Sequence, residues 1–310
     1  MAGRGLILSE HGLGLLLITC GVLLWSTEGL LVRLTAIDGW TLALGANLAM
    51  AFFVGLWTVS RYGRNTVRAY RDIGRPGLLA ALTLGVGNVF FYHAFQATSV
   101  ANVFVLVSSQ PFFAAVLAYV LLREPVRPRL VVLMAVAMAG IAYMFRDSLV
   151  LGSWRGDLMA LAAGILYSAN IICLRSAPTR DGRLRDQMPS HVLGGLLGAA
   201  LVAPLASPST IGGGDLLILL AIGGGSLGAG MWFYTRSFRY LPAAEGALVI
   251  QSQVLIGPLL VWAALGEQPP AATITGGLVV FAALTANAAL GLNDGRRGRL
   301  AARNAGGPLT

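Results

Sequence analysis

The fold is decided by residues 85–124, which read GVGNVFFYHAFQATSVANVFVLVSSQPFFAAVLAYVLLRE. This stretch recurs without a gap 143 positions later, at 228–267, as GAGMWFYTRSFRYLPAAEGALVIQSQVLIGPLLVWAALGE. Glycines and apolar residues coincide often in such a composition, but polar matches are less common. A Ser-Gln pair and a final glutamate match between the copies: Ser109, Gln110 and Glu124 in the first, Ser252, Gln253 and Glu267 in the second. The chain therefore contains an internal repeat.

The repeat extends to an earlier apolar segment of each copy, where the shift becomes 142. Four positions of this segment are matched: Trp25 with Tyr167, Ser26 with Ser168, Glu28 with Asn170, and Arg33 with Arg175. The two copies therefore begin with the same kind of helix, and together they cover most of the chain.

Apolar segments long enough to cross a bilayer occur ten times. A transmembrane helix needs about 20 predominantly apolar residues. The mean hydropathy of +0.74 and the charged fraction of 11% agree with this, because so few charges could not coat a soluble protein of 310 residues. The predicted spans are 12–32, 39–60, 77–96, 101–122, 129–145, 156–174, 191–206, 215–235, 243–265 and 271–292. The sequence predicts an all-α integral membrane protein.

The basic residues predict the orientation of these spans. All 22 are arginine. If the N-terminus is cytoplasmic, 19 of the 22 fall in cytoplasmic segments, and only Arg33, Arg146 and Arg155 fall on the other side. Short loops that carry positive charge stay in the cytoplasm during insertion. We therefore expect a multi-pass protein of the inner (plasma) membrane with both termini in the cytoplasm.

Each copy contains an odd number of spans, so the second copy must enter the membrane from the opposite side. Ten transmembrane helices arranged as two inverted five-helix repeats are the layout of many secondary transporters. We expect the first repeat at 12–146 and the second at 155–292. Residues 293–310 are rich in arginine and predict a disordered cytoplasmic tail.

Several other functional classes lack support. The net charge of +9 follows from the membrane topology, so we expect no nucleic-acid partner. Cys20 and Cys173 lie singly in apolar spans and the histidines are scattered, so the sequence predicts no disulfide framework, metal site or cofactor. The letters Gly223-x-Gly225-x-x-Gly228 match a dinucleotide fingerprint, but they lie in an apolar helix, where small residues favour close helix packing.

Short motifs occur in the same order in both copies. They are Leu24-Trp25-Ser26-Thr27 followed by Arg33, Ser109-Gln110-Pro111 followed by Glu124-Pro125, the run from Phe238 to Ala244, and the run from Gln253 to Glu267. Over about residues 12–292 the chain resembles the ten-helix EamA-type exporters of the drug/metabolite transporter superfamily. The resemblance implies outward movement of small metabolites, often amino acids or drugs. One departure is Val254, which stands where the first copy has Pro111, with Pro258 one turn later, so the bend of the ninth span stays open.

Two ionisable residues inside the spans are candidates for proton coupling. The bilayer core holds no water, so such groups must face a cavity or a partner helix. Glu28 is the one acidic residue well inside a span, and it could bind a proton or the amino group of a substrate. Alternatively, it reaches the interface and pairs with Arg33 or another outer group. His93 could carry a proton, or bond across a helix interface as a neutral residue.

Polar residues at helical spacing predict a lined cavity between the copies. Asn88, Tyr92 and Gln96 recur every four residues and share one face of the third span. Two pairs seven residues apart also line up between the copies: Asn102 with Ser109, and Glu245 with Ser252. Trp25, Tyr167 and Trp232 are candidates for aromatic walls, with interfacial anchoring or core packing as the alternative.

The predicted substrate site combines these observations and holds no catalytic residue. It consists of Trp25, Ser26, Glu28, Asn88, Tyr92, His93, Gln96, Ser109, Gln110, Tyr167, Asn170, Trp232, Ser252 and Gln253. Its partners are expected to be a small-molecule substrate and the lipid bilayer.

The patterns predict a secondary transporter or facilitator that exports a small metabolite, an amino acid (aromatic ones included) or a drug-like amphiphile, by alternating access. Import of a vitamin through the same fold is an alternative, because gradients and coupling set the direction. An intramembrane enzyme is disfavoured, since Glu28 and His93 lie on different helices and offer the only acid–base groups. A scaffold subunit is a third alternative. Substrate identity, coupling ion and oligomeric state are not predicted.

Overall fold

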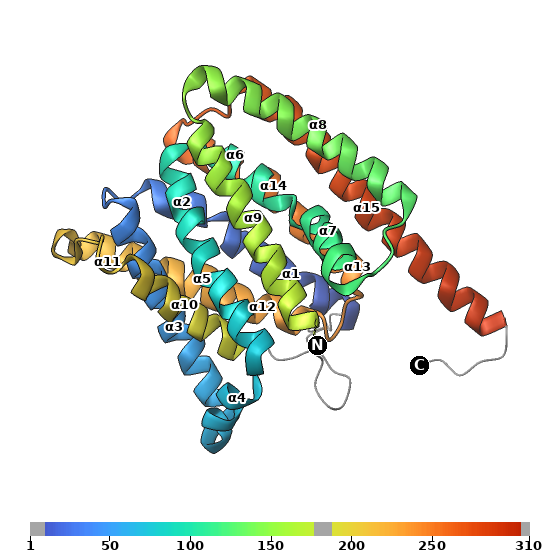
Figure 1. Ribbon diagram of the computed structural model, residues 1–310, viewed down its shortest axis with the longest axis horizontal. Coiled ribbons are helices and arrows are strands. Elements are labelled where there is room, and N and C mark those ends of the chain that lie inside the picture. Colours follow the sequence, from blue (N-terminus) through green and yellow to red (C-terminus); the bar gives the residue numbers. More distant parts are fainter. Residues whose placement is uncertain (1–9, 177–187, 305–310) are drawn as a thin grey trace, which may run out of the picture.

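The computed structural model describes residues 10–176 and 188–304, apart from the side chains of 243–244 and 292–304 (Figure 1). The first half contains α1 (Glu10–Ser26), α2 (Glu28–Arg33), α3 (Gly39–Tyr62), the 3₁₀ turn η1 (Gly63–Asn65), α4 (Thr66–Asp72), α5 (Gly74–Ala97), α6 (Val100–Ser108), α7 (Gln110–Leu122) and α8 (Pro128–Leu151). The second half contains α9 (Trp154–Arg175), α10 (Met188–Val202), the 3₁₀ turn η2 (Pro208–Thr210), α11 (Gly213–Leu220), the π-helical η3 (Ala221–Ala229), α12 (Gly230–Ser237), α13 (Ala243–Gln251), α14 (Gln253–Leu265) and α15 (Ala271–Asn304).

The described residues form helices joined by short connections, and no strand is found among them. Nine of its helical segments are long and apolar enough to cross a membrane. The seventh predicted span, 191–206, corresponds to the shorter α10, which has 15 residues. This helix ends before Pro204, which cannot donate a backbone hydrogen bond and disfavours helical geometry in the residue before it.

The last helix differs from the sequence expectation. Instead of a disordered tail beginning at residue 293, α15 continues to Asn304. Arginine, the most frequent residue of 293–304, is among the better helix formers, so the helix can continue beyond its apolar part. Residues 305–310 lie outside the described residues.

Three spans are interrupted at a single hydroxyl residue. In each case the hydroxyl donates a hydrogen bond to the carbonyl oxygen three residues earlier: Thr27 to Leu24 at 2.7 Å, Ser109 to Leu106 at 2.5 Å, and Ser252 to Val249 at 2.6 Å. Such local bonds compete with the regular helical ladder and bend or end a helix. The interruptions divide α1 from α2, α6 from α7, and α13 from α14.

The bend of the ninth span falls at the position that matches the fourth. Pro111 follows the first interruption and removes a backbone N–H there, whereas Val254 stands at the matched position of the second copy. Pro258 lies inside α14, one turn further on. The interruption nevertheless falls at Ser252, so the shared serine marks the bend in both copies.

The helices pack in the pattern that inverted repeats require. α5 packs against α9, and the matching segments η3 and α12 pack against α1. α10 lies against both α3 and α5, and η3 lies against α3. The final helices of the two copies, α8 and α15, run side by side along one edge of the bundle (Figure 1).

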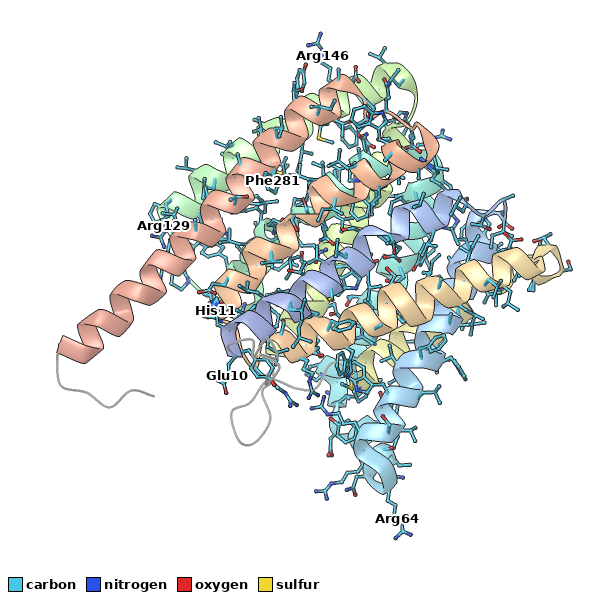
Figure 2. All side chains as sticks on the ribbon, turned by 180° about the vertical axis from the view of Figure 1, so that it is seen from behind. Glu10, His11, Arg64, Arg129, Arg146 and Phe281 are labelled. Atoms are coloured by element: carbon cyan, nitrogen blue, oxygen red, sulfur yellow. The ribbon has the colours of Figure 1, made fainter. Side chains whose placement is uncertain are left out.

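The two ends of the bundle differ in charge. We call the end that carries the connections 62–74, 123–127 and 238–242 the arginine-rich end, and the end that carries 34–38, 98–99, 152–153 and 266–270 the arginine-poor end. Figure 2 shows Arg129 and Arg146 at opposite ends of α8, with Arg64 and His11 toward the same end as Arg129. The gathering of arginines at one end of the bundle agrees with the alternation of spans that the sequence predicts.

Glycines bring the central helices into backbone contact. A Cβ atom on Gly85 would lie 2.4 Å from the carbonyl oxygen of Gly194, and one on Gly223 would lie 2.2 Å from Cβ of Ala49. Both distances are far below van der Waals contact, so only glycine fits. Gly223 belongs to η3 and packs on α3, which confirms that the glycine-rich segment 223–228 packs closely against a neighbouring helix.

We predict that Gly223→Ala destabilises the protein while Gly225→Ala does not. The new methyl group at residue 223 meets backbone atoms of α3 and should cost about 1–3 kcal/mol in the free energy of unfolding. No atom lies within 4 Å of a Cβ built on Gly225, where alanine should be neutral or favourable. Thermal unfolding of the detergent-purified variants measures the difference, and equal losses would contradict the close contact.

Candidate functional site

A buried carboxylate lies where the two copies meet. Glu28 is 4% exposed and accepts a hydrogen bond from the hydroxyl of Tyr92, 2.7 Å from its Oε1. It occupies the first turn of α2, directly after the interruption at Thr27. α2 contacts α5 of the first copy and η3 and α14 of the second. The carboxylate therefore stands at the boundary between the repeats.

Two amides and a second tyrosine continue this polar line one turn away. Asn88 lies four residues before Tyr92 on the same face of α5. Its Nδ2 donates to Oδ1 of Asn47 in α3 at 2.9 Å, and its Oδ1 accepts from the hydroxyl of Tyr167 in α9 at 2.8 Å. We call Glu28, Tyr92, Asn88, Asn47 and Tyr167 the central polar ladder.

Aromatic rings flank the ladder. The ring of Phe91 lies edge-on to Phe95 at a centroid distance of 4.7 Å and to Tyr167 at 6.0 Å. Phe95 in turn meets Phe104 at 5.8 Å. These rings exclude water from the polar groups, so the ladder lies in a low-dielectric environment where its hydrogen bonds are strong.

Trp25 forms the aromatic contact on the α1 side of the site. Its ring lies 5.2 Å from that of Tyr234, and Gly230 leaves room for it, because a Cβ there would lie 2.7 Å from Nε1 of Trp25. Trp232, another candidate for an aromatic wall, lies under the guanidinium of Arg236, whose Cζ is 5.2 Å from the ring centroid. Tyr234 was not among the predicted site residues.

The Ser-Gln pairs stand at the interruptions of the fourth and ninth spans. α6 packs against α14, and each glutamine begins the segment after an interruption. Ser109 is buried, whereas Gln110, Ser252 and Gln253 are partly exposed. The Ser168 hydroxyl donates to the backbone oxygen of Gln110 at 2.9 Å, which ties α9 to the first interruption.

Ser26 and Asn170 serve the helix framework. The Ser26 hydroxyl donates to the carbonyl oxygen of Val22 in its own helix at 2.8 Å. Asn170, which matches Glu28 in the repeat, donates to the carbonyl oxygen of Ala80 at 2.7 Å and so holds α9 against α5. Neither side chain has a described bond to the ladder.

His93 and Gln96 lie apart from the ladder. Nδ1 of His93 donates to the carbonyl oxygen of Val89 at 2.8 Å, and its ring meets Trp40 at 4.2 Å. Gln96 is exposed and donates to the carbonyl oxygen of Ile37 at 2.9 Å, at the arginine-poor end. Of the predicted polar stripe, only Asn88 and Tyr92 join the ladder. The described hydrogen bond of His93 lies within its own helix, and its buried Nε2 has no described partner.

The alternative pairing of Glu28 with Arg33 does not occur. Nε of Arg33 lies 2.7 Å from Oε2 of Glu267 instead. Within the part of the chain that the structure describes, no basic side chain pairs with Glu28, and no group of three or more potential metal ligands is found. The site can bind a proton or a cationic group, and it can present amide and hydroxyl groups to a polar substrate.

Asn47 and Asp157 are buried polar residues that the sequence patterns miss. Asp157 in α9 is 0% exposed and accepts from Thr98 Oγ1 at 2.6 Å and from Asn102 Nδ2 at 2.8 Å. Thr273 donates to Asn102 in turn, which links α15 to this cluster at the arginine-poor end. Asp157 stands at the start of a span, where an acidic residue is ordinary, and Asn47 stands alone among apolar and small residues.

Two comparisons relate the chain to known proteins. A family model described as the EamA-like transporter family matches residues 12–146 and 154–288. A solved structure described only as "Crystal structure of protein" has a TM-score of 0.60 and 19% sequence identity, covering 88% of this chain and 96% of that chain. At this identity the likeness concerns the fold alone. Among curated proteins, none matches the chain.

We predict that Asn88→Ala destabilises the protein by about 1–3 kcal/mol, because it leaves buried groups of Asn47 and Tyr167 without a partner. The control is Thr83→Ala on the same helix, whose hydroxyl bonds only to carbonyls of α5, at 3.0 and 3.1 Å. The control should change stability by less than about 0.5 kcal/mol. Thermal unfolding in detergent measures both, and similar losses would show that the ladder contributes nothing specific.

Proposed function

Because the chain belongs to the EamA-like transporter family, we propose that it exports a small, partly apolar metabolite across the inner membrane by alternating access. The substrate class that we propose is an amino acid, aromatic ones included, or a drug-like amphiphile that carries an amino group. The protein is a member of a transporter family, and a chemical reaction on the substrate is no part of the proposal.

The observation that carries the proposal is the placement of Glu28. Its carboxylate is buried at the boundary of the two copies, bonded to Tyr92 and without a basic partner among the described residues. A charged carboxylate deep in a span costs roughly 2.5–3.5 kcal/mol on insertion scales, unless a proton or a cation compensates it. A substrate ammonium group or a proton would supply that compensation, and each could leave again.

The neighbours of Glu28 favour a substrate with polar and apolar parts. Tyr92 offers a hydroxyl beside the carboxylate, and the Trp25–Tyr234 pair offers aromatic surface on the α1 side. Sites of this composition bind small ligands through apolar contact and fix their orientation with a few polar groups. An amino acid with an apolar side chain matches both kinds of group.

The inverted repeats supply the mechanism in the proposal. A site between two inverted copies opens to one side or the other when the copies exchange conformations. We assign the arginine-rich end to the cytoplasm, since positive charge is retained there during insertion. The same cycle run backwards would import a metabolite such as a vitamin, so transport assays must test both directions.

The direct test is transport by the purified protein in proteoliposomes. We expect counterflow of labelled phenylalanine, or of another compound in a panel of amino acids, nucleosides and vitamins, above the rate of protein-free liposomes. Accumulation of a vitamin alone would favour the import alternative. No movement of any compound in the panel would contradict the proposal.

We predict that Glu28→Gln lowers the transport rate at least about tenfold and removes its pH dependence, because the amide keeps the size but cannot bind a proton or attract a cation. Glu10→Gln is the control, since Glu10 is an exposed residue in the first turn of α1. Both variants should be expressed at normal levels. Unchanged pH dependence in Glu28→Gln would remove that residue from the coupling role.

We predict that Gln110→Ala and Gln253→Ala reduce transport to a similar extent, because the two glutamines occupy matched positions after matched interruptions. The exposed Gln268 provides a control substitution to alanine that should leave the rate unchanged. The measurement is initial counterflow rate per reconstituted protein. If one glutamine is dispensable and the other essential, the shared site between the copies is wrong.

A further inference from the structure

An arginine and a glutamate tie the two copies together at the arginine-poor end. Arg33 Nε donates to Oε2 of Glu267 at 2.7 Å, and its Nη2 donates to Oε1 at 3.1 Å. The same guanidinium donates to the backbone oxygens of Phe95 at 2.5 Å and Thr98 at 2.9 Å. The carboxylate also accepts from the backbone N–H of Val100 at 3.1 Å. This pair therefore holds the connection between α5 and α6 to the first span of its own copy and to the fourth span of the other copy.

The matched residues form a second pair at the arginine-rich end. Nη2 of Arg175 lies 2.8 Å from Oε1 and 3.0 Å from Oε2 of Glu124. Arg175 matches Arg33, and Glu124 matches Glu267, in the internal repeat. Each pair joins the first span of one copy to the fourth span of the other. The two pairs are thus the same interaction, made once at each end.

The two pairs differ in burial. The side chains of Arg33 and Glu267 are 24% and 30% exposed, whereas those of Arg175 and Glu124 are 41% and 47% exposed. The second pair also lacks described bonds to backbone groups. The arginine-poor end is therefore held more firmly in this structure.

Other bonds across the copies follow the same asymmetry. At the arginine-poor end, Asn102 binds the fully buried Asp157. At the arginine-rich end, the matched position of Asn102 is Glu245, which bonds to the more exposed His11 at 2.8 Å. Both kinds of contact indicate one closed end and one looser end.

We propose that the Arg33–Glu267 and Arg175–Glu124 pairs are the two gates of the transport cycle, and that one breaks as the other tightens. The inference rests on the proposed alternating access. In the exchanged conformation Arg175 would reach the backbone oxygens of residues 238 and 241, which match 95 and 98. Partly exposed ion pairs suit this role, because they contribute little net stability and can break readily.

Two matched positions report the opening of each gate. Val261 is 1% exposed and lines a small recess that also includes Glu267. Its counterpart in the first copy is Ala118, which is 5% exposed and whose carbonyl oxygen accepts from the backbone N–H of Glu124 at 3.3 Å. Each is replaced by cysteine in a full-length background in which Cys20 and Cys173 are changed to serine.

The experiment measures the rate at which a membrane-impermeant maleimide labels each cysteine from each side of reconstituted vesicles. We expect Glu267→Gln to raise labelling at Val261→Cys at least about fivefold and to lower it at Ala118→Cys. Glu124→Gln should do the reverse. Arg68→Gln, which removes an exposed ion pair with Asp72 within one helix, is the control and should change neither rate.

The gate assignment is wrong if Glu267→Gln and Glu124→Gln leave both labelling rates unchanged, or raise both together. The exchanged double variant Arg175→Glu with Glu124→Arg keeps the pair whose side chains make no described bonds to the backbone, and should restore the rates that Glu124→Gln changes, which separates gating from general unfolding. Failure of the exchange to restore labelling, in protein with normal thermal stability, also counts against the proposal. Because labelling needs no substrate, reciprocal changes without transport of any compound would refute the proposed substrates and leave the gates standing.

Discussion

The absence of water from the bilayer core governs this structure. Each polar group that enters the membrane must find its partner inside the protein. The backbone meets this demand by forming helices, and the side chains meet it by bonding between helices, as Asn88 does with Asn47 and Tyr167. Glu28 is satisfied only in part, with a single described hydrogen bond. A buried carboxylate with so little internal compensation is suited to receive a proton or a cationic group from outside.

Much of the architecture was predictable because the bilayer restricts which residues can cross it. Long apolar segments predict the spans, and the arginines predict at which end of the bundle each connection lies. The repeat of five spans predicts that the two halves are inverted. The helix interruptions were partly predictable. Pro111 suggested one of them, but the second falls at Ser252 without a neighbouring proline, because the serine hydroxyl itself bonds back to the helix.

The site was less predictable, since spacing along one helix does not say which helix will lie opposite. Asn88 and Tyr92 were found from their common face, but Gln96, one turn further, extends past the ladder to the end of the bundle. No polar residue at helical spacing marks Asn47 in the sequence. It joins the ladder because α5 packs on α3 and brings Asn88 to it. His93 is adjacent to Tyr92 in the chain but packs on Trp40. Residues three or four apart share a face, and consecutive residues do not.

The crossed ion pairs have a consequence for the origin of the two-copy chain. Neither half can complete its own bridge, because each arginine finds its glutamate in the other half. A single five-helix polypeptide bearing one arginine and one glutamate at these positions would satisfy both bridges by associating with a second molecule inserted upside down. Duplication and fusion of the gene for such a polypeptide would preserve both bridges. The two halves could then diverge in sequence, and the matched residues Glu28 and Asn170 are such a difference.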